Sequence, residues 1–248
     1  MTTQPKLWVH GLTGRMGASI RQELGAFHFS LVGGSGLESG LSELSSGLSE
    51  SDCIIDVTSP IGHDTLIEAF EGGELTKKRV LICTTGLSKQ QLGHWKQTAK
   101  PRGLTVLAAP NTSLGILLML KSALAVAGLS LANGFDIEME ETHHRGKADA
   151  PSGTAIFLAR NLCKTNPKLK VTSQRKGARE KNEIGISATR GGGVFGEHRI
   201  RFLGDHEELA ITHRAFSRSL FARGALLLTE WLVKQQPGFH KLEEVSLN

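Results

Sequence analysis

The chain has 248 residues, 39% of them apolar, and a formal net charge of +5 at pH 7. This length and apolar content allow one large domain, or two small ones, with a buried core. The basic residues are not gathered into one tract, and their densest stretch, at 164–181, is typical of a solvated loop. The charge therefore favours an anionic small-molecule partner, and no nucleic acid is expected.

The first half of the chain alternates short apolar runs with amphipathic segments. Apolar residues at every fourth position predict a helix at 16–24, and two further helices are expected at 64–70 and 89–100. Strands that alternate with helices at this interval indicate βαβ units and a Rossmann-type parallel sheet, so the fold class is α/β. The stretch 34–51 cannot be assigned. The apolar runs predict strands at 6–10, 27–33, 53–57, 79–83 and 105–109.

The pattern changes after about residue 111. A long apolar helix is expected at 114–131, a half-buried strand with period two at 135–142, and a helix after Pro151. A closing helix follows at 221–234. Together these elements predict a second, α+β domain with an open mixed or antiparallel sheet. Further strands of antiparallel character are expected at 183–190, 198–203 and 208–213.

These patterns predict two domains. Residues 1–112 form the expected dinucleotide-binding domain, and residues 113–218 form the expected substrate-binding and oligomerisation domain. The C-terminal helical segment, 219–248, is expected to pack back on the first domain, because the chain ends soon after the second sheet is complete.

Cysteine usage and apolar runs indicate the compartment. Cys53, Cys83 and Cys163 are far apart and lie in apolar runs, which is typical of reduced thiols rather than of a disulfide framework. Residues 1–6 contain no apolar signal region. No apolar stretch approaches the roughly 20 residues that a membrane span needs. We therefore expect a cytoplasmic protein that binds no membrane.

A glycine-rich turn, G-L-T-G-R-M-G at 11–17, follows the first predicted strand. In a dinucleotide fold such glycines let the backbone turn sharply beside the pyrophosphate, and the next helix directs free amide groups at the phosphates. Thr13 stands where the commonest fingerprint has its second glycine, so an ordinary strand-to-helix turn is the alternative. The position directly after the first strand favours dinucleotide binding.

The end of the second strand bears on the choice of dinucleotide. An acidic residue there usually holds the ribose hydroxyls of NAD. Here the strand ends in V-G-G-S-G, at 32–36, and the nearest acid is Glu38. Arg15, beside the glycine turn, could instead pair with a 2′-phosphate. The sequence favours NADPH, or the use of both NADPH and NADH.

The segment 141–155, E-T-H-H-R-G-K-A-D-A-P-S-G-T-A, directly follows a predicted strand. It places His143, His144 and Lys147 just before a helix whose predicted N-cap is Ser152. Free amides at a helix start bind carboxylates, and histidine and lysine side chains carry movable protons. The segment therefore predicts a site for a dianionic substrate that gains a proton.

Two other interpretations of this segment exist. A His-His pair often ligates a metal, but the sequence contains no H-E-x-x-H pattern. His198, His206 and His213 are scattered, without cysteines at zinc spacing, so no metal site is expected. An exposed polar loop is the second alternative, but such a loop would not require a capped helix directly behind four basic groups, which are His143, His144, Arg145 and Lys147.

The same segment resembles the signature of the dihydrodipicolinate reductases, H-H-x-x-K-x-D-x-P-S-G-T-A, without a break from His143 to Ala155. Other motifs of that family occur in family order and cover nearly the whole chain. They are G-x-x-G-R-M-G at 11–17, I-I-D-V-T-S-P at 54–60, T-T-G at 84–86 and G-E-H at 196–198.

The resemblance implies an oxidoreductase that uses NADPH or NADH to reduce 4-hydroxy-tetrahydrodipicolinate to tetrahydrodipicolinate with loss of water, in lysine and diaminopimelate biosynthesis. It implies proton transfer by His143 and Lys147, and binding of the dicarboxylate substrate by His144, Gly153 and Thr154. It also implies a homotetramer formed through the sheet of the second domain. The implied dinucleotide contacts are Gly11, Leu12, Thr13, Gly14, Arg15, Met16, Cys83, Thr84, Thr85, Pro110, Asn111, Thr112 and Ser113.

Departures from the family pattern all concern the dinucleotide side. Cys83 stands where the family usually has the first glycine of G-T-T-G, Val57 replaces a common phenylalanine, and Thr112 replaces the phenylalanine of N-F-S. The missing acid of the second strand is the fourth departure, so the cofactor preference stays open. Two functional alternatives remain: another nicotinamide enzyme, such as an amino-acid or semialdehyde dehydrogenase, and a dinucleotide-binding sensor without catalysis.

Overall fold

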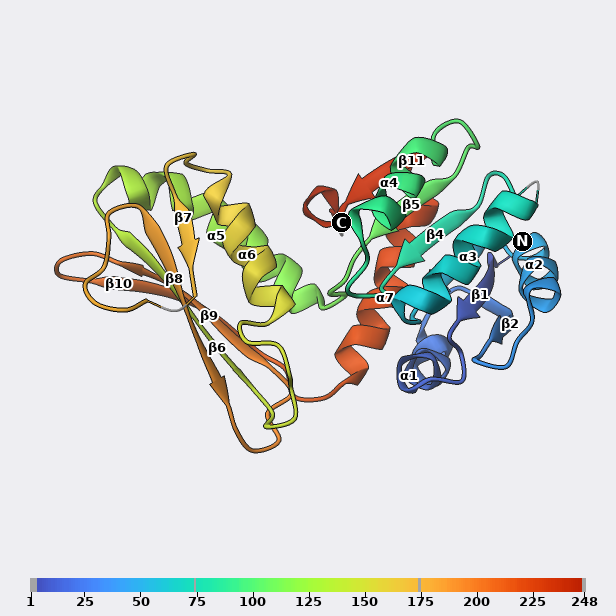
Figure 1. The fold of residues 1–248 in the computed structure, drawn as a ribbon, viewed down its shortest axis with the longest axis horizontal. Coiled ribbons are helices and arrows are strands. Elements are labelled where there is room, and N and C mark those ends of the chain that lie inside the picture. Colours follow the sequence, from blue (N-terminus) through green and yellow to red (C-terminus); the bar gives the residue numbers. More distant parts are fainter. Residues whose placement is uncertain (1–3, 74, 174, 247–248) are drawn as a thin grey trace. The chain divides into compact units, whose positions relative to one another are not determined.

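The computed structural model describes residues 4–73, 75–173 and 175–246. The chain divides into two compact units, each built around its own sheet (Figure 1). Unit 1 comprises Met1–Leu114 and Ser219–Asn248, and unit 2 comprises Gly115–Arg218. Unit 1 is thus formed from both ends of the chain.

A six-stranded sheet in the order β11-β5-β4-β3-β1-β2 forms the centre of unit 1, and all its neighbouring strands are parallel. The predicted Rossmann-type sheet is therefore confirmed. Its strands are β1 (Lys6–His10), β2 (Ser30–Ser35), β3 (Cys53–Asp56), β4 (Arg79–Ile82), β5 (Thr105–Ala108) and β11 (Gly238–Lys241). The helices of unit 1 are α1 (Arg15–Glu23), α2 (Leu41–Glu50), α3 (Pro60–Gly72), α4 (Lys89–Thr98) and α7 (Ser219–Val233), with short 3₁₀ turns η1 (Leu24–Ala26) and η2 (Leu242–Glu244).

Helices cover both faces of this sheet, which is why its strands are continuous apolar runs rather than alternating ones. On one face, side chains such as Ile54 of β3 and Val80 of β4 pack with Leu66 of α3 and Trp95 of α4. On the other face, α7 lies against β3, β4 and β5 and also contacts α1. All four residues of β3 are buried, including Asp56 at its end.

Three parts of unit 1 differ from expectation. The second strand is β2, three residues later than predicted, because residues 24–26 form the turn η1. The stretch 34–51, which the sequence does not assign, contains α2, whose Leu44 and Leu48 lie one turn apart in the core. The C-terminal segment is not helical throughout: α7 ends at Val233, and β11 then pairs with β5 as an edge strand. Pro237 comes directly before β11, where a helix could not easily continue.

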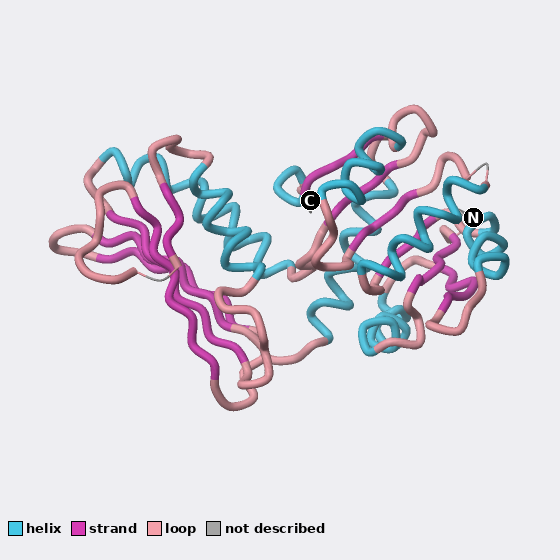
Figure 2. Tube along the Cα trace, in the orientation of Figure 1, coloured by secondary structure: helices cyan, strands magenta, loops and turns pink. Residues whose placement is uncertain are grey.

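Unit 2 contains a five-stranded mixed sheet in the order β10-β9-β6-β8-β7. Figure 2 shows α5 and α6 on the same side of this sheet. The side chains of these helices form one core with alternate residues of the strands, such as Ile137 and Met139 of β6. The elements are α5 (Leu114–Ala132), β6 (Asp136–His143), α6 (Gly153–Cys163), β7 (Lys170–Thr172), β8 (Glu183–Arg190), β9 (Glu197–Leu203) and β10 (Glu208–Arg214).

Two predictions for this sheet were wrong. Strand β8 pairs parallel to β6, not antiparallel, because the connection between them, which includes α6 and β7, brings the chain back in the same direction. The sequence predicts a loop at 164–181, but strand β7 lies within this stretch and pairs parallel with β8. Strands β9 and β10 are antiparallel as expected.

The helix α5 also corrects an expectation about membrane-spanning length. It runs for 19 residues with a mean hydropathy of 2.0, long and apolar enough by length and composition to cross a membrane. The expectation that no apolar stretch approaches this length was therefore wrong. Ile116, Leu120 and Ala123 of this helix are buried in the core of unit 2.

Candidate active site

The glycine turn of unit 1, at 11–17, is hydrogen-bonded to the end of β2. The backbone N–H groups of Gly11 and Leu12 both donate to the carbonyl of Ser35, over 3.0 and 2.9 Å. Gly11 has a φ of 95°, and a Cβ on Gly17 would lie 2.4 Å from the Gly11 oxygen, so both positions require glycine. Gly14 is the N-cap of α1 and offers no capping side chain, which leaves the first amides of α1 to an outside acceptor.

A pocket of about 280 Å³ lies where β3, β4 and β5 end. In a parallel α/β sheet, ligands bind at these carboxyl ends. Five residues with a predicted dinucleotide contact are among those that line it, together with three that were not predicted to contact a dinucleotide. The lining residues are Met16, Val57, Thr58, Cys83, Thr85, Pro110, Thr112 and Phe221.

The remaining predicted contacts of unit 1 have other surroundings. Leu12 and Thr84 are buried, and the N–H group of Leu12 is already used by Ser35. Thr13, Gly14 and Arg15 are exposed. These residues could therefore contact a dinucleotide through different groups. A residue with a buried side chain would use its backbone, whereas Arg15 would use its side chain.

The stretch 110–113 is locked in place by α7. The hydroxyl of Thr112 donates to the carbonyl of Phe221 over 2.7 Å. A Cβ on Gly224 would lie 1.7 Å from the Thr112 oxygen, so the helix backbone packs directly on this stretch. The side chain of Asn111 accepts a 2.9 Å hydrogen bond from the Ser113 N–H. One wall of the pocket therefore depends on the C-terminal helix.

A polar network lies beneath the pocket at the end of β3. The Asp56 carboxylate accepts from His63 Nδ1 over 2.6 Å, from the Thr84 hydroxyl over 2.7 Å and from the Thr58 hydroxyl over 2.6 Å. His63 Nε2 accepts from Trp95 Nε1 over 2.8 Å, so its Nδ1 must carry the hydrogen. Burial raises the pKa of Asp56, but these donors outweigh it and keep the pKa below its usual value.

The polar segment of unit 2 connects β6 to α6. Ser152 is the N-cap of α6, as predicted, and its hydroxyl accepts from the Ala155 N–H over 3.2 Å. The carboxylate of Asp149 accepts from Lys147 Nζ over 2.7 Å and from the Gly153 N–H over 3.2 Å. Asp149 therefore already occupies Lys147 and the Gly153 amide, the two groups that the sequence analysis assigns to the substrate site. His144 and Thr154 are half-buried on either side of this loop.

His143 ends β6 and is held by a buried carboxylate. Its Nδ1 is bonded to Glu141, which also accepts from Arg190 over 2.7 Å and from the Ser152 N–H over 3.0 Å. Burial lowers the pKa of His143, the Glu141 charge opposes that change, and the net pKa is below the usual value. A Cβ on Gly196 would lie 3.0 Å from His143 Nε2, so the imidazole rests against a glycine.

His198 of β9 completes this cluster. Its Nε2 lies 3.2 Å from the Ser152 hydroxyl, and its ring packs edge-on against His143 with 5.1 Å between centroids. Burial, followed by the neighbouring His143, lowers the pKa of His198 to about 3, so its imidazole is neutral. Donor atoms of Glu141, His143 and His198 lie within 4.8 Å of one another, as metal ligands would. Those of Glu141 and His143 are engaged with each other, and Arg190 brings a cation against the same carboxylate, which disfavours a metal there.

Sequence reasoning brought together His143, His144, Lys147, Gly153 and Thr154, which all lie on the segment from the end of β6 to the first turn of α6. It gave no role to Glu141, Arg190 and His198. The signal for Glu141 was available, because it precedes His143 by two residues in a strand and so shares its face. The pairing of β6 with β8 and β9 brings in the other two, and spacing along the chain does not reveal it.

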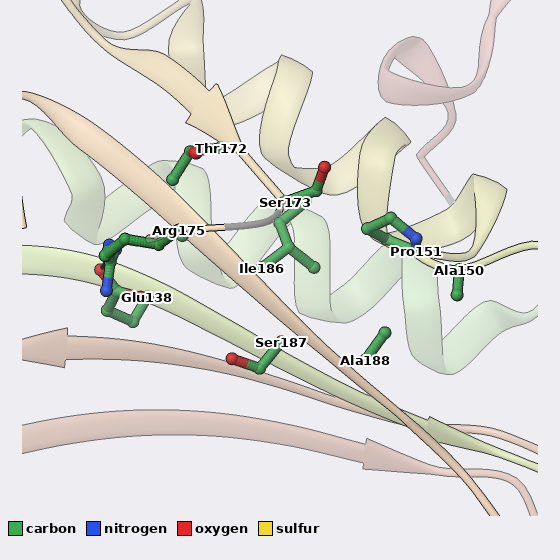
Figure 3. Close-up of a pocket in the computed structure, with 10 residues that line it drawn as sticks. Glu138, Ala150, Pro151, Thr172, Ser173, Arg175, Ile186, Ser187 and Ala188 are labelled. Carbon is green, nitrogen blue, oxygen red and sulfur yellow. Dashed lines mark hydrogen bonds and ion pairs between the residues drawn. The ribbon is translucent and has the colours of Figure 1, made fainter. Parts of the chain in front are cut away.

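A second pocket, of about 550 Å³, lies in unit 2 next to the end of the loop that connects β6 to α6 (Figure 3). Figure 3 draws Arg175 beside Glu138, and the two form an ion pair. The lining of this pocket includes Ala150 and Pro151 but neither His143 nor Lys147, so we assign the pocket no part in the chemistry. The other lining residues are Thr172, Ser173, Gly185, Ile186, Ser187 and Ala188.

Comparisons with known proteins agree with the motifs. Residues 5–112 match the family model "Dihydrodipicolinate reductase, N-terminus", and residues 115–245 match "Dihydrodipicolinate reductase, C-terminus". A 4-hydroxy-tetrahydrodipicolinate reductase of Aquifex aeolicus is 40% identical over 218 residues, 86% of this chain and 78% of that protein. One of Zymomonas mobilis is 37% identical over 97% of this chain and 96% of its own length.

A solved structure has the same fold. It is a dipicolinate-bound dihydrodipicolinate reductase from Paenisporosarcina sp. TG-14, with a TM-score of 0.78 and 23% identity. The match covers 98% of this chain and 100% of that one. A diaminopimelate dehydrogenase of C. glutamicum matches less closely, with a TM-score of 0.58 and 10% identity over 99% of this chain and 95% of its own.

Proposed function

The chain belongs to the dihydrodipicolinate reductase family, and we propose that it reduces 4-hydroxy-tetrahydrodipicolinate to tetrahydrodipicolinate with NADPH or NADH, as a step of lysine and diaminopimelate biosynthesis. The observation that carries the proposal is the match of both family models, which together span residues 5–112 and 115–245. The reaction takes up one hydride and one proton and releases water. It needs a dinucleotide site and a dicarboxylate site with a proton donor.

Unit 1 is the proposed dinucleotide-binding unit. Support comes from the turn at 11–17, whose glycines permit a close approach, and from the uncapped first turn of α1. When bound, the reduced dinucleotide supplies the hydride that adds to the substrate ring. Thr85, Cys83 and the stretch 110–113 would hold the nicotinamide end. Arg15 is exposed beside the phosphate turn and can pair with a 2′-phosphate, so NADPH remains the favoured dinucleotide.

Unit 2 is the proposed dicarboxylate-binding unit. His144, the amide of Gly153 and the hydroxyl of Thr154 would bind the substrate carboxylates at the start of α6. Because Asp149 accepts from the Gly153 N–H, a substrate carboxylate must take over that donor from Asp149. Lys147 pairs with the other oxygen of the same carboxylate, so displacement of the whole Asp149 side chain would also free Lys147 for proton transfer.

His143 and Lys147 are the proposed proton-transferring groups. The Glu141 carboxylate accepts from His143 Nδ1, so the proton would leave from Nε2. Binding the dianion in one pose beside these groups is the main contribution expected from this unit.

Assembly and location are proposed from the family resemblance. The face of the unit 2 sheet opposite α5 and α6 carries ion pairs of strand residues, such as Arg201 with Glu140 and with Glu208. The homotetramer through this sheet is proposed from the family resemblance alone. The expected location is the cytoplasm.

Two variants test the assigned roles. Lys147→Ala and His143→Ala should each lower kcat by about 10²- to 10⁴-fold, the usual contribution of a general acid, while both variants remain folded. The measurement is dinucleotide oxidation with freshly prepared 4-hydroxy-tetrahydrodipicolinate, beside a melting curve. Wild-type turnover in both variants would refute the roles. Lys121→Ala, an exposed position on α5, is the matched control for loss of a lysine.

A further inference from the structure

One buried carboxylate connects the separate parts of the unit 2 site. The side chain of Glu141 is 0% exposed. It precedes His143 by two residues on β6, so the two side chains share a face of the strand. That face is the one covered by α5 and α6, where a charge is costly unless it is fully hydrogen-bonded. Glu141 therefore needs partners, and their identity indicates its role.

The partners come from three different segments. The first is the imidazole of His143, bonded through Nδ1. The second is the backbone N–H of Ser152, the N-cap of α6, at 3.0 Å. The third is Arg190 of β8, whose Nη2 donates over 2.7 Å and also donates to the carbonyl of Asp149. A single carboxylate thus joins the proposed acid to the loop and helix start that would hold the substrate.

We propose that Glu141 is the positioning residue of this site, which fixes His143 as the Nδ1–H tautomer and ties its imidazole to the start of α6. The inference deepens the proposed function and rests on it for the role of His143. A carboxylate only accepts hydrogen bonds, so the nitrogen facing it must carry a hydrogen. Nε2 is then the nitrogen that exchanges a proton, and its position relative to Gly153 and Thr154 is fixed.

The charges around His143 agree with this assignment. Burial lowers its pKa and Glu141 raises it, whereas Lys147, on the loop, and Arg190, on β8, lower it further. His198 of β9 packs against the ring and is neutral, with a pKa of about 3. Glu141 is the negative group that favours the imidazolium form, so its loss should lower the pKa of His143.

Replacement by glutamine separates positioning from simple space-filling. The amide has nearly the same shape but only one accepting oxygen, and three donors converge on the carboxylate. If the amide nitrogen faces His143, Nδ1 must become an acceptor and the hydrogen moves to Nε2. This arrangement is the expected one, because the amide oxygen then keeps the two donors on its side of the group, the Ser152 N–H and the cationic Arg190. The tautomer of His143 in Glu141→Gln therefore reports the loss of the connection between Glu141 and His143.

The direct test is the tautomer of His143, read from ¹⁵N chemical shifts and two-bond couplings of the histidine rings in the whole protein. We expect Nδ1–H in the wild type and in Glu141→Asp, which keeps the accepting charge, and a full or partial shift to Nε2–H in Glu141→Gln. Glu140→Gln is the matched control: it removes the same charge from the adjacent residue, which is 44% exposed and pairs with Arg201. An Nε2–H tautomer in the wild type, or an unchanged tautomer in Glu141→Gln, would overturn the inference.

Kinetics give a second readout that a purely structural role would not move. If His143 acts as an acid, kcat falls as pH rises through its pKa, and Glu141→Gln should shift this fall to lower pH. The expected loss of kcat is about 10²- to 10⁴-fold, as for other orienting carboxylates of catalytic histidines. A loss confined to KM with an unshifted profile would contradict the positioning of His143.

The tautomer measurement needs no substrate, so its outcome is independent of the reductase assignment. A wild-type protein without turnover would refute the proposed function, whereas the tautomer would still test Glu141. Should Glu141→Gln fail to fold, Glu141→Asp decides the question, because an Nε2–H tautomer in that variant would refute the inference.

Discussion

Replacement of the buried His198 offers a quantitative test of the unit 2 cluster. Burial lowers its pKa from 6.5 to about 3, so the unfolded chain binds a proton that the folded protein rejects. A histidine with a depressed folded pKa contributes stability that is present above pH 6.5 and is lost as pH falls towards 3. Between pH 7.5 and 5.0 this single group should therefore remove about 2 kcal/mol of the free energy of unfolding.

His198→Gln should abolish that loss, because the amide stays neutral and can still donate to Ser152. We expect the free energy of unfolding of the wild type to fall by about 2 kcal/mol more than that of the variant between these two pH values. The control His206→Gln, at an exposed position next to β10, should behave as the wild type.

The assay must report on unit 2. The three tryptophans, Trp8, Trp95 and Trp231, all belong to unit 1, so fluorescence would follow the wrong part of the chain. Urea unfolding by far-UV circular dichroism, together with amide hydrogen exchange in β6 and β9, provides the local free energy. An equal loss of stability in the wild type and in His198→Gln would refute the reasoning.

Two further predictions concern close contacts. Gly196→Ala adds a Cβ that would lie 3.0 Å from His143 Nε2, at a φ of 156° that itself strains alanine. The loop or the ring must shift by a few tenths of an ångström, so kcat should fall about 10-fold. Steady-state kinetics check this, and Gly193→Ala, in open space, should leave kcat unchanged; equal activities would contradict the contact. Trp95→Phe removes the donor to His63 and should cost about 1–3 kcal/mol by urea unfolding. A stability equal to that of the wild type would mean that the bond is unimportant.

The features that could be predicted from the sequence are those that depend on periodic patterns or on neighbouring residues. The apolar runs of unit 1 correspond to β1 and β3–β5, since a sheet covered on both faces produces continuous buried strands. The cap at Ser152 followed from residue type and position, and the structure contains it. The turn at 11–17 likewise follows β1 directly.

Elements that depend on distant pairing were missed. β7 and β11 have three and four residues, too few to display a period, and each exists because a neighbouring strand accepts it. The direction of β8 depends on the whole connection from β6, which includes α6 and β7, and not on its own residues. The same limit applies to the site: Arg190 and His198 reach Glu141 and Ser152 through sheet pairing, at separations of 49 and 46 residues.

The measurement that tests the central claim most directly is the oxidation of NADPH, and separately of NADH, by the purified protein with freshly prepared 4-hydroxy-tetrahydrodipicolinate. We predict rapid oxidation that depends on this substrate, and the ratio of the two rates gives the cofactor preference for a chain with Arg15 and no acid at the end of β2. A folded protein that binds the dinucleotide but oxidises neither form would contradict the reductase assignment and favour a dinucleotide sensor.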